Sequence, residues 1–217
     1  MCKPIKEEML PALQAAVKDS MSPYRFAHTE GVAQTVAELA ALFEADATAL
    51  QAAALLHDVT KEWSAEKALA YLAENGISLR PDERVSPKVY HGITAVPFIQ
   101  KAYAPYATPT VLSAVRWHTT GRDGMTLEEA LLYLADYIEP GRRFDDCVAL
   151  RKAFFDAPLQ AMSMAERQDH LWQILLQSFD YTLAALAAEG APVCADTLAA
   201  RAYVAKKIIP RKEPKDE

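Results

Sequence analysis

The sequence predicts an all-α protein built as one domain, and three observations support this prediction. The 217 residues suit one large domain, and a hydrophobic content of 51% can fill a single sizeable core. Helical periodicity runs through most of the chain, whereas no segment alternates polar and apolar residues as a half-buried strand would. No repeat, low-complexity run or composition break divides the sequence before its last residues.

The helices can be placed from their apolar stripes and their end signals. Residues 29–43 carry apolar side chains at three- and four-residue steps, namely Val32, Val36, Leu39 and Phe43. Asp46 can cap a second helix that reaches about His57, and Ser64 a third that ends before Asn75 and Gly76. Further helices fit residues 91–102, 109–118, 126–138, 147–156, 165–188 and 196–207. Thr126 and Glu129 form a capping box at the start of the third of these.

Two places depart from regular helix. Pro97 lies inside the segment 91–102 and removes a backbone donor, so we expect a kink there or a later start of that helix. Residues 206–217 are predicted to form a charged C-terminal tail, frayed from Pro210 onward, after a main domain of residues 1–205.

Composition excludes several classes of function. A net charge of −6 argues against nucleic acid as the main partner, and the longest apolar runs are too short to span a membrane. Residues 1–8 carry both charge signs and lack the apolar region of a signal peptide. Cys2, Cys147 and Cys194 are odd in number and widely spaced, which predicts reduced thiols in a cytoplasmic protein.

The histidines indicate where the chemistry lies. Four of the five fall on the apolar stripe of a predicted helix or at its start, namely His28, His57, His91 and His118. Asp58 follows His57 directly, and Asp136 lies within the apolar segment 131–138. Any one of these residues alone would more often be a hydrogen-bonded structural residue. A buried carboxylate is costly unless it is paired or binds a cation, and one or two metal ions would satisfy all six side chains together. His170 lies among polar neighbours and is predicted to be on the surface.

The order His28, His57-Asp58, Asp136 matches the signature of the HD phosphohydrolase superfamily, and four surrounding blocks are more specific. These are ALLHDVTK at residues 54–61, YHG at 90–92, RWHTTGRDGM at 116–125 and YLADYIEPGR at 133–142. They resemble the YqeK-type family of bacterial symmetrical bis(5'-nucleosyl)-tetraphosphatases. The resemblance covers roughly residues 20–205, with a motif core at 28–142. It implies an HD-domain helical bundle with a buried metal site.

The resemblance also implies roles for the six polar residues. His28, His57, Asp58 and Asp136 would hold a divalent metal, with iron expected. His91 and His118 would face the same cavity, either as ligands of a second metal, which Asp58 would then bridge, or as contacts to phosphate; the sequence does not choose. A metal-activated water would attack an inner phosphorus, so that diadenosine tetraphosphate gives two molecules of ADP.

An anionic nucleotide on a net-acidic protein needs local positive charge. Lys61, one turn beyond His57-Asp58, is expected to bind phosphate or to protonate the leaving group. Thr119, Arg122 and Arg142 are expected to bind the polyphosphate, whereas Arg143 is assigned to the solvated surface.

The segment DTLAARA at residues 196–202 resembles a family segment that covers the nucleotide, which makes Thr197 and Arg201 candidate contacts. Ala202 stands where the family usually has Asn, so one amide contact is lost. Two alternatives remain: an HD phosphohydrolase acting on a nucleoside monophosphate or a deoxynucleotide, and a non-catalytic nucleotide-binding module, which the complete ligand set disfavours. The oligomeric state is not fixed, and a homodimer is among the states the sequence allows.

Overall fold

The computed structural model describes residues 4–208, and every regular element in this range is helical, as predicted. Cys2 and residues 209–217 of the predicted tail lie outside the described residues, while residues 206–208 belong to the last helix. None of the described helices is long and apolar enough to cross a membrane. The α-helices are α1 (Leu10–Lys18), α2 (Pro23–Phe43), α3 (Ala47–Leu56), α4 (Ala65–Glu74), α5 (Pro81–Arg84), α6 (Tyr90–Ala102), α7 (Pro109–Trp117), α8 (Leu127–Ile138), α9 (Asp145–Phe155), α10 (Met164–Ala188) and α11 (Ala195–Ile208). Three short 3-10 helices are η1 (Glu7–Met9), η2 (Pro87–Val89) and η3 (Ala104–Tyr106).

Helix α2 begins six residues earlier than the apolar stripe predicts, at Pro23 instead of Thr29. Its N-cap is Ser22, whose hydroxyl accepts a hydrogen bond from the backbone N–H of Arg25 at 3.2 Å. Proline suits the first helical position because its missing N–H would have no partner there. The earlier start places His28 in the second turn of the helix instead of before it.

The other end signals are confirmed. Asp46 caps α3 by accepting from the N–H of Ala49 at 2.9 Å, and Thr126 forms the predicted capping box with Glu129 at the start of α8. The sequence prediction missed α1 and α5. A later start at Pro97 was also wrong, because α6 begins at Tyr90 and runs through Pro97 to Ala102.

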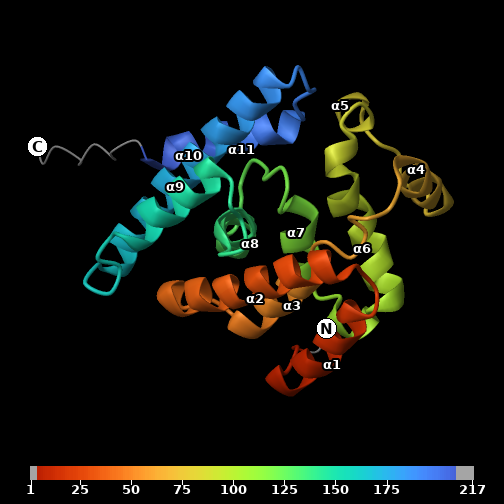
Figure 1. Cartoon of the computed structure of the whole chain (residues 1–217), viewed down its shortest axis with the longest axis horizontal. Helices are drawn as coiled ribbons and strands as arrows, with labels where there is room; N and C mark the ends of the chain where they lie inside the picture. The colour runs from red at the N-terminus through yellow and green to blue at the C-terminus, as the bar shows by residue number, and fades with distance from the viewer. Residues whose placement is uncertain (1–3, 209–217) are drawn as a thin grey trace, which may run out of the picture.

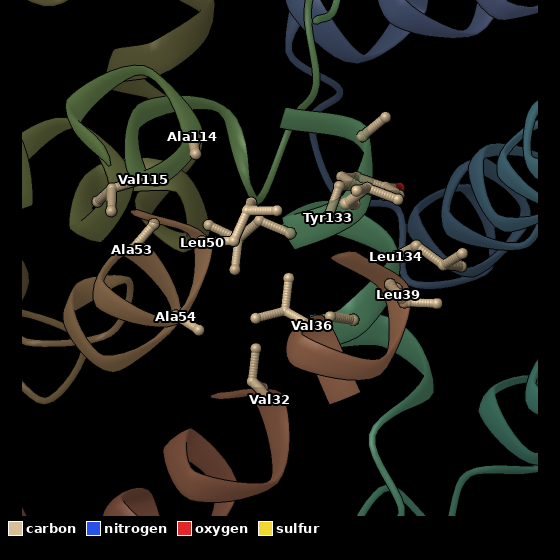
Figure 2. Packing of buried hydrophobic residues seen from close by; sticks show 14 of the residues in the cluster. Val32, Val36, Leu39, Leu50, Ala53, Ala54, Ala114, Val115, Tyr133 and Leu134 are labelled. Carbon is tan, nitrogen blue, oxygen red and sulfur yellow. The ribbon is translucent and has the colours of Figure 1, made fainter. Parts of the chain in front are cut away.

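Helix α3 is the centre of the core. Seven of its ten residues are buried and none is exposed, and it contacts α1, α2, α7 and α8. Figure 2 shows Leu50, Ala53 and Ala54 of α3 beside Val32 and Val36 of α2. A helix that is apolar on all sides has to be enclosed by its neighbours. The residues that directly follow α3 are therefore delivered into the interior.

The helices that carry the predicted polar residues are direct neighbours. Helix α2 packs on α3 and α8, α7 packs on α3 and α8, and α6 packs on α7. Figure 1 shows α10 and α11 together on one side of this group and α4 and α5 on the other. The fold thus brings segments that are far apart in sequence to one interior position.

One predicted phosphate ligand, Arg122, is engaged in holding the loop between α7 and α8. Its Nε donates to both carboxylate oxygens of the fully buried Glu129, at 2.9 and 3.1 Å. Glu129 also accepts from the backbone N–H of Thr126 at 3.0 Å and from the hydroxyl of Ser113. Arg122 therefore supplies the counter-charge of a buried carboxylate.

We predict that Arg122→Ala lowers the free energy of unfolding by about 1–3 kcal/mol, because it removes a partner from a buried ionised group. Urea denaturation of the variant measures the change. Arg84→Ala is the control, since Arg84 is exposed and forms no ion pair with any described residue, and it should stay within about 0.5 kcal/mol of wild type. Wild-type stability of Arg122→Ala would contradict this structural role.

Candidate metal centre

Six polar residues from five neighbouring segments converge in the interior. His28 lies on α2, Asp136 on α8, and His91 in the first turn of α6, while His57 and Asp58 directly follow α3 and His118 directly follows α7. Four of them are buried, and the side chains of His28 and Asp136 are 10% and 18% exposed. The centre therefore opens to the surface on the side of His28 and Asp136.

One set of ligand-type atoms comes from His28, His57 and Asp136, all within 4.8 Å of one another. Nε2 of His28 lies 3.0 Å from Oδ1 of Asp136, and Nε2 of His57 lies 3.9 Å from the same oxygen. Oδ2 of Asp58 is 3.5 Å from His57 Nε2 and 3.8 Å from His28 Nε2. Two imidazole nitrogens and two carboxylates thus face one point.

A second set shares Asp58. His57, Asp58 and His118 form another group whose ligand atoms lie within 4.8 Å of one another. The other oxygen of Asp58, Oδ1, is 3.4 Å from His91 Nε2 and 3.8 Å from His118 Nε2, and these two nitrogens are 2.9 Å apart. The hydroxyl of Thr119 lies 3.0 and 3.1 Å from the same nitrogens. Asp58 lies between the two sets and presents one oxygen to each.

Several buried atoms at the centre form no well-oriented hydrogen bond with any described residue, although His28 Nε2 lies beside Asp136. Nε2 of His28, Nε2 of His57 and Oδ1 of Asp58 are buried without a hydrogen bond. Leaving a buried polar atom unsatisfied costs about 1–3 kcal/mol, and more for a charged one. Imidazole nitrogens and carboxylate oxygens are ligands of divalent first-row metals, and a cation here would partner all three atoms. The residues present fit a divalent metal.

The second nitrogen of His57 and of His118 is held by a backbone carbonyl. Nδ1 of His57 lies 2.6 Å from the carbonyl of Ala54, and Nδ1 of His118 lies 2.7 Å from the carbonyl of Val115. Because a carbonyl only accepts, these nitrogens carry the proton and donate it. In the neutral ring, Nε2 is then left as an unprotonated ligand atom facing the centre.

The ionisation states of these carboxylates and imidazoles suit the binding of a cation. Burial opposes ionisation of both carboxylates, but His57 beside Asp58 and Arg142 beside Asp136 outweigh it, and the pKa of each carboxylate lies well below its ordinary value. Burial lowers the pKa of His118 to about 4 and that of His91 well below its ordinary value, so both are neutral. Burial also disfavours the charged form of His28, but neighbouring carboxylates raise its pKa to about 9. His28 must therefore release a proton to bind a metal.

Two residues at the centre were missed by sequence reasoning. Arg25 donates from Nη1 to Oδ2 of Asp58 at 2.7 Å. Glu139 is buried and accepts from Nδ1 of His28 at 3.1 Å and from the N–H of Gly141 at 2.5 Å. A Cβ at Gly31 would lie 2.5 Å from Oε2 of Glu139, and a Cβ at Gly141 would lie 2.8 Å from it. The two glycines leave room for the carboxylate that orients His28, and they are the signal in the sequence that could have indicated it.

Three of the other predicted site residues lie at the centre. Nζ of Lys61 is 3.2 Å from His91 Nε2, and burial lowers the pKa of this lysine. Arg142 donates from Nη2 to Oδ1 of Asp136 at 2.6 Å. Thr119 contacts both histidines of the second set, as described above.

The remaining predicted contacts lie elsewhere. Besides Arg122, Arg201 pairs with Asp180 at 2.5 Å, and both side chains are partly exposed. Thr197 is buried in the wall of a mostly apolar cavity of about 400 Å³, which Thr119 also lines.

His170 is half-buried and not on the surface as predicted. Its ring stacks on Phe154, and its Nε2 lies 3.1 Å from the carbonyl of that residue. It belongs to the packing of α9 on α10 and does not contribute to the centre.

Glu139 supplies a test of the centre that does not depend on turnover. Removing a carboxylate that orients a metal-binding histidine typically weakens metal binding by about 10- to 100-fold. We predict a loss of this size for Glu139→Ala, measured by titrating Mn²⁺ into chelator-treated protein. Glu38→Ala is the matched control, because Glu38 is an exposed carboxylate on α2 that forms no ion pair with any described residue. A folded Glu139→Ala protein with wild-type metal affinity would contradict the positioning role.

Comparisons with known proteins agree with the resemblance found in the sequence. The model of the HD domain family matches residues 25–141, more than half of the chain. A protein of Bacillus subtilis (strain 168) named symmetrical bis(5'-nucleosyl)-tetraphosphatase is 34% identical over 84% of this chain and 90% of its own length. A protein of the same name from Halalkalibacterium halodurans is 28% identical over the same shares. A crystal structure of a predicted HD superfamily hydrolase from Clostridium acetobutylicum, described as involved in NAD metabolism, superposes with a TM-score of 0.78 at 29% identity. That match covers 91% of this chain and 97% of the other.

Proposed function

This chain belongs to the HD domain family, and we propose from that premise that it is a metal-dependent hydrolase that cleaves dinucleoside tetraphosphates symmetrically. On diadenosine tetraphosphate the products would be two molecules of ADP. The observation that carries the proposal is the convergence of buried ligand atoms without a hydrogen bond, from His28, His57 and Asp58, at an interior point close to the cations Lys61 and Arg142. The similarity to two tetraphosphatases over most of both chains supports the substrate.

His28, His57, Asp58 and Asp136 are the proposed metal ligands. Iron is the proposed metal, and support comes from a ligand set of imidazole and carboxylate without thiolate, which suits iron among other divalent metals. When bound, the metal would supply a nucleophilic water at neutral pH and neutralise charge on the phosphate. His91 and His118 either hold a second ion or contact phosphate, and the atoms involved are the same in both cases.

The protein's own cations take the remaining charge of the tetraphosphate. Arg142 and Arg25 flank the two carboxylates and offer further N–H donors to phosphate oxygens. Hydrolysis adds OH to one inner phosphorus and breaks its bond to the central bridging oxygen, which leaves on the second diphosphate and takes up a proton. Lys61 is proposed to bind that oxygen or to give it the proton. Its buried position lowers its pKa and favours proton donation.

The proposal includes the cellular location of the protein and its biological origin. Cys147 and Cys194 are free and buried, which supports a reducing, cytoplasmic location. The bacterial origin of the similar tetraphosphatases supports a bacterial enzyme. The substrate is a small nucleotide, and a homodimer stays a prediction.

The position of cleavage tests the proposal directly. Diadenosine tetraphosphate incubated with metal-loaded protein should give ADP alone at early times, since attack at an inner phosphorus divides the molecule equally. Chromatography of an early sample separates the products. An early mixture of AMP and ATP would assign the protein to a different type of hydrolase.

The proposed ligands can be tested in the same assay. His57→Ala and Asp58→Ala should each lose bound metal and more than about 99% of turnover, because each removes a ligand from the central pair. His170→Ala is the matched histidine control and should keep both, with its melting temperature recorded because the ring packs on Phe154. A metal-free Asp58→Ala protein with full activity would exclude the proposed centre.

A further inference from the structure

Two large aromatic side chains are exposed beside the metal centre. Tyr24 is 80% exposed and Phe144 is 68% exposed, the highest values among the exposed large hydrophobic residues of the described chain. Both line one cavity of about 740 Å³, and His28 forms part of its wall. Because the two exposed rings line the same cavity instead of lying singly on the surface, they form an apolar patch of the kind that marks a ligand-binding groove.

The same cavity carries three arginines. Arg25, Arg142 and Arg143 line it together with the two aromatic residues. Nε of Arg25 is buried without a hydrogen bond, and its guanidinium lies 6.0 Å from the ring centre of Tyr24. Arg143 is exposed and forms no ion pair with any described residue. Unused guanidinium donors beside a flat apolar ring suit a ligand that is anionic at one end and aromatic at the other.

The cavity is one of several that border residues of the metal centre. A second cavity of about 510 Å³ is lined by Lys61, His118 and Asp136 and shares Arg142 and Phe144 with the first. His28 borders the first cavity and His118 the second, so the proposed ligands lie between them. A substrate with two nucleosides joined through the reacting phosphates needs such an arrangement.

We propose that the cavity lined by Tyr24 and Phe144 is a nucleoside subsite, in which the base of one nucleotide half stacks on these rings and Arg25 and Arg143 bind its phosphates. The inference rests on the proposed function, because it assigns one half of a dinucleoside substrate to this cavity and the other half to the second cavity. Stacking on an aromatic ring tolerates any base, so this subsite binds adenine and guanine alike.

The charges favour a nucleotide over a second copy of the chain. In a two-fold dimer built on this face, the arginine-lined cavity of one copy would meet or approach that of the other. Like charges across an interface are unfavourable, whereas a polyphosphate neutralises them.

The test measures the KM for diadenosine tetraphosphate of metal-loaded Tyr24→Ala and Phe144→Ala. Each should raise KM about five- to tenfold with little change in kcat, because a base at the edge of the site is stacked equally in the ground state and the transition state. Tyr24→Phe should behave as wild type. Phe155→Ala is the control, since Phe155 is also partly exposed, at 39%, and lines a different cavity.

Inorganic tetraphosphate separates base stacking from phosphate binding. As a competitive inhibitor it has no base, so its inhibition constant should be unchanged in Tyr24→Ala and Phe144→Ala and raised about tenfold in Arg143→Ala. An equal loss of inorganic tetraphosphate binding in the aromatic variants would overturn the stacking role.

Failure of this inference and failure of the proposed function look different. A wild-type protein that forms ADP, together with aromatic variants of wild-type KM, overturns the subsite and leaves the function standing. A wild-type protein that forms no ADP contradicts the function itself. If Tyr24→Ala or Phe144→Ala has a lower sedimentation coefficient than the wild-type protein, this face binds a second copy of the chain and the proposed subsite is wrong.

Discussion

The main constraint on this fold is that two carboxylates and four imidazoles lie together at one interior point beside helix α3. Asp58 is 3% exposed and His57 fully buried, so neither can be satisfied by bulk solvent. Arg25 and Arg142 each neutralise one carboxylate, yet Nε2 of His57 and Oδ1 of Asp58 keep no hydrogen-bond partner. Buried polar atoms without a hydrogen bond are costly, so a further cation bound at this point would stabilise the fold.

The packing around the centre serves that requirement. Backbone carbonyls of α3 and α7 fix the proton of His57 and His118 on the outer nitrogen, and Glu139 does the same for His28. Glu139 can keep its present position beside His28 because Gly31 and Gly141 lack a Cβ. A change far from the reacting phosphates can therefore disturb the ligand geometry, and the centre and the fold cannot be separated into independent parts.

Sequence patterns that span only one or two helical turns predicted most of the helices correctly. The apolar stripe of α2, the Asp46 cap and the capping box at Thr126 are encoded within one or two turns. The six polar residues were correctly expected to point into the core, although His57, Asp58 and His118 follow their helices instead of lying on them. Contacts between distant segments could not be read in this way. Arg25 contacts Asp58, and Glu139 contacts His28, from which it is separated by more than a hundred residues. Only the packing of α2 against α3 and α8 brings these pairs together. Arg122 followed the family pattern of a phosphate contact, but in the structure it pairs with the buried Glu129.

The central claim is that a divalent cation completes a centre that the protein alone leaves unsatisfied. The most direct measurement is the free energy of unfolding, by urea denaturation, of metal-loaded and chelator-treated protein, with His57→Ala measured in parallel. A metal that binds only the folded state should stabilise wild type by about 2.7 kcal/mol at a free concentration one hundred times its Kd, and should leave His57→Ala almost unchanged. Equal stability of the loaded and chelated wild-type protein would contradict the account.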